Sequence, residues 1–317
     1  MRIVLITPYL PEVRNGNAHT AVRWRRFLRQ AGHRVDMALD WDGRPADLLI
    51  ALHARRSHGP LARFALAHPD RPRVLMLTGT DLYRDIRSDA DAQDSLARAT
   101  HIVVLQDQGL AELAPDIRAK ARVIHQSAPS LAAARRPVRH FDVCIASHLR
   151  DEKDPFRGAL ASRLLPAASR IRLIHVGGPL QEGMAEAARD LAGQCPRWRW
   201  LGARSHGETR RRIARAHLLL LSSPMEGGAN VICEAVTSGT PVLASRVSGN
   251  VGMLGEDYPG YYPFGDTAAL AALLERAERD GGFYAALRAA CAARAPLFAP
   301  AREAALVAAL AEDCRCA

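Results

Sequence analysis

Short apolar runs alternate with longer stretches of helical periodicity along the first half of the chain. The runs predict strands at 2–6, 34–39, 47–52, 73–78, 101–105 and 121–124. Helices are predicted near 18–31 and 57–67. Because parallel strands need helix-length connections, this alternation predicts a parallel sheet covered on both faces.

A second series of the same kind begins near residue 140. It predicts strands at 141–146, 170–176, 197–201, 217–222 and 240–245. The intervening segment, 126–139, carries two prolines and few strand formers, which is typical of a linker. We therefore expect an α/β chain of two Rossmann-like, doubly wound domains facing a central cleft, with ligands at the carboxyl ends of the strands.

The domain boundaries are expected at 1–130 for the N-terminal domain and 138–299 for the C-terminal domain, which agrees with the length of 317 residues. The Ala-rich end of the chain is predicted to be helical, with Pro296 and Pro300 as breaks. Residues 300–317 are thus expected to form a short C-terminal helix and tail. Packing of this helix back on the N-terminal domain is left open.

The net charge of +10 comes from 43 basic against 33 acidic residues, and it is spread along the chain. With 5% aromatic residues and no recognition motif, nucleic-acid binding is not expected. The longest apolar runs fall well short of the ~18 residues that span a bilayer, so we expect a cytoplasmic protein without stable membrane insertion. The helix near 18–31 carries Trp24, Phe27 and Leu28 on one face, which favours packing on the sheet over a membrane-surface helix.

Six scattered cysteines without a CxxC pair favour neither a disulfide framework nor structural zinc. Cys314 and Cys316 are expected to be reduced, exposed thiols of the tail. Three tyrosines, Tyr258, Tyr261 and Tyr262, are expected to pack in the core or loops and not to stack on a sugar.

The most informative segment runs from a strand near 217–221 through Gly227 and Gly228 into a helix. The first amides of that helix have no intrahelical acceptor, and the two glycines let a phosphate come close, so the helix start is a predicted anion site. Its amides belong to Ala229, Asn230 and Val231. Glu226 before the turn and Glu234 in the helix can both meet a ligand that lies along this end, although either acid alone is typical of a solvated helix terminus.

The spacing of Glu226 and Glu234, followed by EAVTSGTPVLAS, resembles the nucleotide-sugar site of GT-B glycosyltransferases of the GT4 type. Segments in matching order are Asn15–Asn17, Ser147–Lys153, His175–Pro179 and Leu201–Arg204. The resemblance covers nearly the whole chain. It implies the GT-B fold and a hexosyltransferase that uses no metal or other cofactor.

In this family Glu234 would hold the ribose and Glu226 the transferred sugar, while the helix amides and Lys153 would hold the diphosphate. Other implied donor contacts are Gly16, Asn17, Gly177 and Arg204. The family's diphosphate-binding arginine falls at His148 here, with Arg150 two residues later. Either Arg150 supplies the charge, or Lys153 and the helix stabilise the leaving group.

Three N-terminal segments follow strand ends, and their side chains suit a small anion. The candidate acceptor residues are His19, His53, Arg55, Arg56, Thr78, Thr80 and Asp81. Structural alternatives remain open: a helix-cap position for His19, a satisfied buried ring for His53, a solvated helix start for the arginines and a cap for Asp81.

These segments, with the glycine region and DYPGYYPFGD at 257–266, look like the selenosugar synthases of selenoneine biosynthesis. That resemblance implies transfer from UDP-N-acetylglucosamine or UDP-glucose to selenophosphate, forming a C–Se bond, a 1-seleno-sugar and UDP. The predicted catalytic residues are Glu226, His19 and Lys153. Since selenophosphate is already a soft anion, no general base is needed, and attack opposite UDP predicts inversion.

Two other functions remain open at this point. An ordinary GT4-type transferase would use a lipid, glycan or hydroxyl acceptor, with Asp81 or Glu226 as the base. A non-catalytic nucleotide-sugar-binding module is the second. In each case the expected ligands are small molecules, and partner enzymes of the same pathway are left open.

Overall fold

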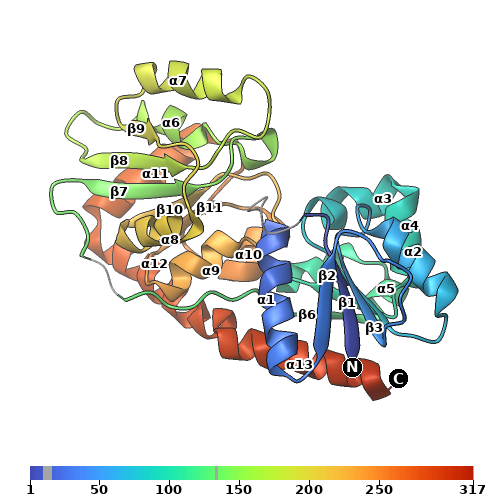
Figure 1. Ribbon diagram of the computed structural model, residues 1–317. Coiled ribbons are helices and arrows are strands. Elements are labelled where there is room, and N and C mark those ends of the chain that lie inside the picture. The colour runs from blue at the N-terminus through green and yellow to red at the C-terminus, as the bar shows by residue number, and fades with distance from the viewer. Residues whose placement is uncertain (10–15, 133–134, 317) are drawn as a thin grey trace. The chain divides into compact units, whose positions relative to one another are not determined.

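The computed structural model describes residues 1–9, 16–132 and 135–316, so Asn15 lies outside the described part. The chain divides into two compact units, each built around one sheet (Figure 1). The N-terminal unit comprises Met1–Ser127, Gly227–Ala229 and Pro300–Ala317. The C-terminal unit comprises Ala128–Glu226 and Asn230–Ala299.

The N-terminal unit contains a six-stranded parallel sheet of order β2-β1-β3-β4-β5-β6. Its strands are β1 (Arg2–Ile6), β2 (Arg34–Ala38), β3 (Leu48–Leu52), β4 (Arg73–Met76), β5 (His101–Val104) and β6 (Ala121–Val123). Its helices are α1 (Gly16–Gln30), α2 (His58–Ala67), α3 (Ile86–Ser88), α4 (Ala90–Arg98), α5 (Pro115–Ala119) and α13 (Pro300–Cys316). All six predicted strands are present, each ending within two residues of its predicted end.

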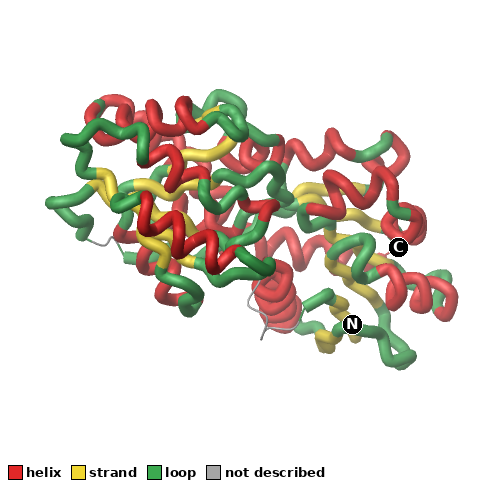
Figure 2. The backbone as a smooth tube through the Cα atoms, turned by 90° about the horizontal axis from the view of Figure 1, so that it is seen from above, coloured by secondary structure: helices red, strands yellow, loops and turns green. Residues whose placement is uncertain are grey.

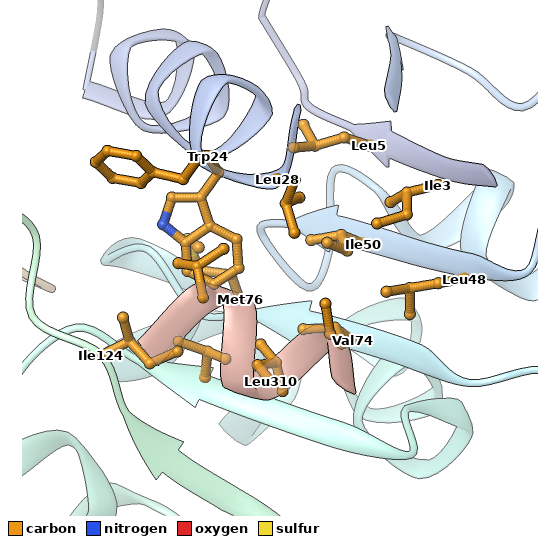
Figure 3. Packing of buried hydrophobic residues seen from close by; sticks show 14 of the residues in the cluster. Ile3, Leu5, Trp24, Leu28, Leu48, Ile50, Val74, Met76, Ile124 and Leu310 are labelled. Carbon is orange, nitrogen blue, oxygen red and sulfur yellow. The ribbon is translucent and has the colours of Figure 1, made fainter. Parts of the chain in front are cut away.

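Apolar side chains fill both faces of this sheet. On one face, Trp24 and Leu28 of α1 and Leu310 of α13 pack over the central strands (Figure 3). The other face is covered by α2 and α4. Trp24 is fully buried. This confirms the prediction that α1 is a sheet-packing helix, because its apolar stripe is occupied by the core.

The C-terminal end of the chain differs from the expectation in two ways. The terminal helix α13 is long, with 17 residues, and begins at Pro300. A proline at the first helical position costs no hydrogen bond, so Pro300 starts this helix. Cys314 is buried, and burial raises the pKa of its thiol to about 11. Of the two predicted tail thiols, only Cys316 is exposed.

The C-terminal unit holds a second six-stranded parallel sheet, of order β12-β11-β10-β7-β8-β9. Its strands are β7 (Phe141–Ala146), β8 (Ile171–Val176), β9 (Trp198–Trp200), β10 (Leu218–Leu221), β11 (Val242–Ser245) and β12 (Tyr261–Tyr262). Its helices, drawn in red beside the yellow strands in Figure 2, are α6 (Arg157–Ser162), α7 (Met184–Gln194), α8 (His206–Arg215), α9 (Asn230–Thr237), α10 (Ser248–Leu254), α11 (Thr267–Arg279) and α12 (Gly281–Arg294). The five strands predicted here are present, and β12 is an addition.

The tyrosines around β12 are structural, as predicted. Their hydroxyl groups donate to backbone carbonyls: Tyr258 to Val242 O, Tyr261 to Asn250 O and Gly255 O, and Tyr262 to Leu221 O at 2.9 Å. Each hydroxyl group therefore links β12, or the loop before it, to the backbone of a neighbouring segment.

Strand order also fixes where ligands can bind in each unit. In the C-terminal sheet the chain reverses direction of winding between β7 and β10, and in the N-terminal sheet between β1 and β3. Crevices in doubly wound sheets open at the carboxyl ends of such strand pairs. A ligand site is therefore expected at the loops after β7 and β10 in one unit, and after β1 and β3 in the other. Within the described residues, no helix is both long enough and apolar enough to cross a membrane.

Candidate functional site

An ion pair between Lys153 and Glu226 lies at the switch point of the C-terminal sheet. Lys153 Nζ, in the loop after β7, donates to Glu226 Oε1, in the loop after β10, at 2.5 Å. Ser223 Oγ donates to the same oxygen at 2.6 Å. Ser222 Oγ bonds the backbone carbonyls of Lys153 and Asp154 at 3.1 and 2.7 Å. Two adjacent serines therefore hold both partners of the pair.

The backbone of Glu226 is held from its other side by α10. A Cβ added at Gly249, the second residue of α10, would lie 1.6 Å from the carbonyl oxygen of Glu226. Only glycine permits this approach. Glu226 is 8% exposed, so its attraction to Lys153 is screened little by water. The pair is therefore a partly dehydrated ion pair between the loops after β7 and β10.

Glu234 is the second predicted acid, and it lies in α9 with 6% exposure. Its Oε1 is 2.5 Å from Nε2 of His206, the first residue of α8. Arg204, one of the expected donor contacts, is exposed and pairs with Glu208 at 3.4 Å. His206 had no motif to mark it in the sequence, because its partner is 28 residues away.

The loops after β7 and β8 are joined at Gly177. A Cβ at Gly177 would lie 1.8 Å from Ser147 O, so this glycine serves close packing of the two loops. His175 Nε2 lies 3.0 Å from the same carbonyl, and burial lowers the pKa of His175 to about 4. His148 and Arg150 are half-buried in the first loop. Arg150 Nε is buried without a hydrogen-bond partner among the described residues.

The two glycines before α9 are packed against the N-terminal unit, to which Gly227–Ala229 belong. A Cβ at Gly227 would lie 2.4 Å from Thr78 O, and one at Gly228 would lie 2.5 Å from Leu105 Cβ. The glycines thus allow close backbone packing in addition to any approach by a phosphate. The helix begins at Asn230, one residue after the predicted start, and Asn230 and Val231 are half-buried.

In the N-terminal unit, the loops after β3 and β4 form a polar cluster around His53. His53 is buried, has a positive φ of 75°, and its Nε2 lies 3.2 Å from Thr80 Oγ1. Asp81 is fully buried. Its carboxylate accepts backbone N–H groups from Ala54, Thr78 and Gly79 at 3.0, 2.9 and 2.8 Å. Asp81 therefore fixes both loops. It does not act as the expected cap, because it is the first residue inside the turn Asp81–Asp85 and its carboxylate accepts amides that precede it.

Asp85, which no pattern in the sequence marks, completes this cluster. Asp85 Oδ2 lies 4.0 Å from His53 Nε2 and 3.2 Å from Arg55 Nε, and its side chain is 5% exposed. Arg55 is thus charge-compensated. Arg56 is exposed, lies 5.2 Å over the ring of Tyr9, and forms no ion pair with another described residue. Asp85 lies four residues after Asp81, one helical turn further along the chain. This spacing places both acids on one side only if the segment is helical, which the sequence alone does not show.

Gly16, Asn17 and His19 lie in the first turn of α1, where Gly16 is exposed and the other two are half-buried. This turn follows β1, the strand next to β3. In the described residues, no group of three or more His, Cys, Asp or Glu side chains is arranged to hold a metal ion.

Comparison with known proteins agrees with this architecture. Residues 132–296, which include the Lys153–Glu226 pair and Glu234, match the family model "Glycosyl transferases group 1". A search of curated proteins returned no match.

Among solved structures, sucrose-phosphate synthase from Thermosynechococcus elongatus is similar, with a TM-score of 0.81, 17% identity, and coverage of 99% of this chain and 98% of that one. HepE of Anabaena, solved with UDP and glucose, has a TM-score of 0.76 and 16% identity, and covers 99% of this chain and 100% of its own. These likenesses establish the GT-B architecture of two Rossmann-like domains. With the family model spanning more than half of its length, the chain belongs to the glycosyl transferases group 1 family.

Proposed function

We propose that this protein transfers a sugar from UDP-N-acetylglucosamine or UDP-glucose to selenophosphate, releasing UDP and forming a 1-seleno-sugar for selenoneine biosynthesis. The observation that carries the transferase part is the Lys153–Glu226 pair at the switch point of the C-terminal sheet, inside the family-matched region. The selenium part rests on the chemistry of the N-terminal cluster and on the resemblance of the segments around it.

The C-terminal unit binds the donor in this proposal. Glu234 accepts the ribose hydroxyl groups, and His206, bonded to that carboxylate, fixes its orientation. Lys153, Arg150 and the backbone amides of Asn230 and Val231 stabilise the charge that develops on UDP as it leaves. This donor class agrees with HepE, a protein of the same fold that was solved with UDP-glucose.

The N-terminal unit binds the acceptor. Arg56 is an exposed guanidinium beside Tyr9, and its fork matches the oxygen atoms of a phosphate. Both acids considered as general bases for a hydroxyl acceptor are already engaged: Asp81 by three backbone amides, and Glu226 by Lys153 and Ser223. A nucleophile that needs no base fits such a site better than an alcohol does.

The reaction then has a simple balance. The selenium atom forms a bond to the anomeric carbon while the bond from that carbon to the diphosphate oxygen breaks, and the electron pair leaves with UDP. Hydrolysis of the P–Se bond releases phosphate and the selenol. Attack opposite UDP inverts the anomeric centre, so an α-linked donor gives an equatorial selenium substituent, which anomeric NMR of fresh product detects.

A hydroxyl acceptor is the second candidate, because His53 lies 4.0 Å from the buried Asp85 carboxylate, an arrangement open to base catalysis. A UDP-release assay separates the two. The purified protein is supplied with UDP-N-acetylglucosamine or UDP-glucose, together with selenophosphate, thiophosphate, phosphate or simple alcohols. Release that requires selenophosphate or thiophosphate supports the proposal, whereas release that requires an alcohol overturns its acceptor half.

A further inference from the structure

The buried ring of His53 has a defined tautomer, because a backbone amide faces one of its two nitrogen atoms. His53, in the loop after β3, is 3% exposed. The N–H of Arg56 donates to His53 Nδ1 at 3.4 Å. A ring nitrogen that accepts a hydrogen bond carries no proton, so the proton of the neutral imidazole is on Nε2.

Two carboxylates beside the ring agree with this assignment. Asp81 Oδ2 lies 4.0 Å from Nδ1, but it already accepts the amide of Ala54 at 3.0 Å. Asp85 Oδ2 lies 4.0 Å from Nε2 and accepts no hydrogen bond from the described residues, although Arg55 Nε is 3.2 Å away. An unsatisfied carboxylate oxygen on the Nε2 side of the ring favours a proton on that nitrogen.

The proton on Nε2 decides what the hydroxyl group of Thr80, in the loop after β4, can do. His53 Nε2 lies 3.2 Å from Thr80 Oγ1, so the ring donates and the hydroxyl oxygen accepts. The single proton of the hydroxyl group must then be donated elsewhere. Thr80 immediately precedes the helical turn Asp81–Asp85 but makes no capping bond to it with its side chain. Since Thr80 is half-buried, its hydroxyl proton is available to a ligand.

Thr78, two residues earlier, differs in this respect. Its Oγ1 donates to Asp81 Oδ1 at 3.4 Å, so its proton is already used within the loop. Of the two threonines expected at the acceptor site, Thr80 is therefore the one that can donate to a ligand. A donor held in this way fits an atom that only accepts, such as an oxygen atom of a phosphate group, better than a hydroxyl group that must also place its own proton.

We propose that Thr80 donates its hydroxyl proton to an oxygen atom of the acceptor's phosphate group, and that His53 is a positioning residue that keeps this proton turned to the ligand. This role rests on the proposed function, because it assumes that the N-terminal unit binds a phosphate-type anion. It also distinguishes His53 from a general base. With its proton on Nε2, the ring cannot take a proton from a hydroxyl acceptor at that atom.

UDP release at varied concentrations of selenophosphate or thiophosphate tests the proposal on the full chain. Thr80→Val keeps the shape of the side chain without the hydroxyl group, whereas Thr80→Ser keeps the hydroxyl group. A hydrogen bond to a charged group corresponds to roughly a tenfold or larger change in affinity, so the KM for either anion should rise by about that factor in Thr80→Val. In Thr80→Ser it should stay near the wild-type value, and the KM for the UDP-sugar should be unchanged in both variants.

Variants of His53 test its positioning role. His53→Leu removes both ring nitrogen atoms, whereas His53→Gln keeps an N–H near the position of Nε2. The first should raise the KM for the anion as Thr80→Val does, and the second should restore most of the affinity. Because His53 acts through Thr80, the double variant His53→Leu/Thr80→Val should bind the anion no more weakly than Thr80→Val alone. Additive losses in the double variant overturn the positioning role.

The matched control is Thr100→Val, the same substitution just before β5 in the same unit. Thr100 Oγ1 donates to Arg73 O at 3.0 Å and accepts from Arg73 N at 2.9 Å, so its role is structural. This variant should have a lower melting temperature and unchanged KM values. An unchanged anion KM in Thr80→Val, or an equal rise in Thr100→Val, overturns the proposal while leaving the selenophosphate reaction in place. If the wild-type protein releases no UDP with either anion, the proposed acceptor is wrong and the role of Thr80 falls with it.

Discussion

Replacing Gly249 with alanine should displace Glu226, the acid that we propose contacts the transferred sugar. The added Cβ would lie 1.6 Å from Glu226 O, and the separation must rise to at least 3.0 Å, a movement of about 1.4 Å. Glu226 Cβ is also only 3.0 Å away, so the residue must move as a whole. Its bonds to Lys153 and Ser223, at 2.5 and 2.6 Å, cannot survive such a shift. Since a 1 Å misplacement can cost ~100-fold in rate, we expect kcat/KM to fall by about that factor, or ~2.7 kcal/mol.

The assay is UDP release with selenophosphate and the preferred UDP-sugar, accompanied by thermal unfolding. Overpacking of this kind should also lower the stability of the unit by about 1–3 kcal/mol. Gly193→Ala is the matched control, because that glycine lies in α7 with no atom within 4 Å of an added Cβ. It should keep wild-type activity. A folded Gly249→Ala protein with wild-type kcat/KM would refute the role given to the Lys153–Glu226 geometry.

Three further predictions concern the two sites and one buried histidine. Glu234→Ala should raise the KM for the UDP-sugar about tenfold or more with a smaller effect on kcat, and a normal UDP affinity by calorimetry would contradict it. Arg56→Ala should raise the KM for selenophosphate and leave UDP affinity unchanged, whereas Arg87→Ala, on the surface, should alter neither. His175 is neutral when folded, so stability should fall as pH drops from 6.5 toward 4, by up to about 3 kcal/mol. Urea unfolding at several pH values should show this slope flattened in His175→Gln, and equal slopes would refute it.

Much of the fold could be predicted because buried parallel strands read as continuous apolar runs, as in β3 (Leu48–Leu52) and β10 (Leu218–Leu221). The strand β12 escaped prediction because two residues show no periodicity. The length of the terminal helix could not be predicted, because the sequence does not show how far the helix that begins at Pro300 continues. The burial of Cys314 likewise depends on the core that α13 shares with α1, which is tertiary information.

The residues of the candidate site also fall into two groups, those that a local sequence pattern marks and those that only the fold brings together. Glu226 and Glu234 could be found because they flank one glycine turn, so a local pattern marks them. His206 and Asp85 could not, because only the fold brings each of them close to its partner, Glu234 for His206 and Arg55 for Asp85. The conformation of His53 is the clearest example of what the sequence does not predict. Its φ is positive, which is rare outside glycine, and the loops around it are held by Asp81 through three backbone amides.

The most direct test of the account is mass spectrometry of the products formed from selenophosphate and a panel of UDP-sugars. We expect UDP together with a product of one hexose or N-acetylhexosamine carrying one selenium atom, recognised by the isotope pattern of selenium. Formation of this product should depend on Arg56 and Glu234. A product that lacks selenium, or sugar transfer that proceeds equally well without selenophosphate, would contradict the central claim.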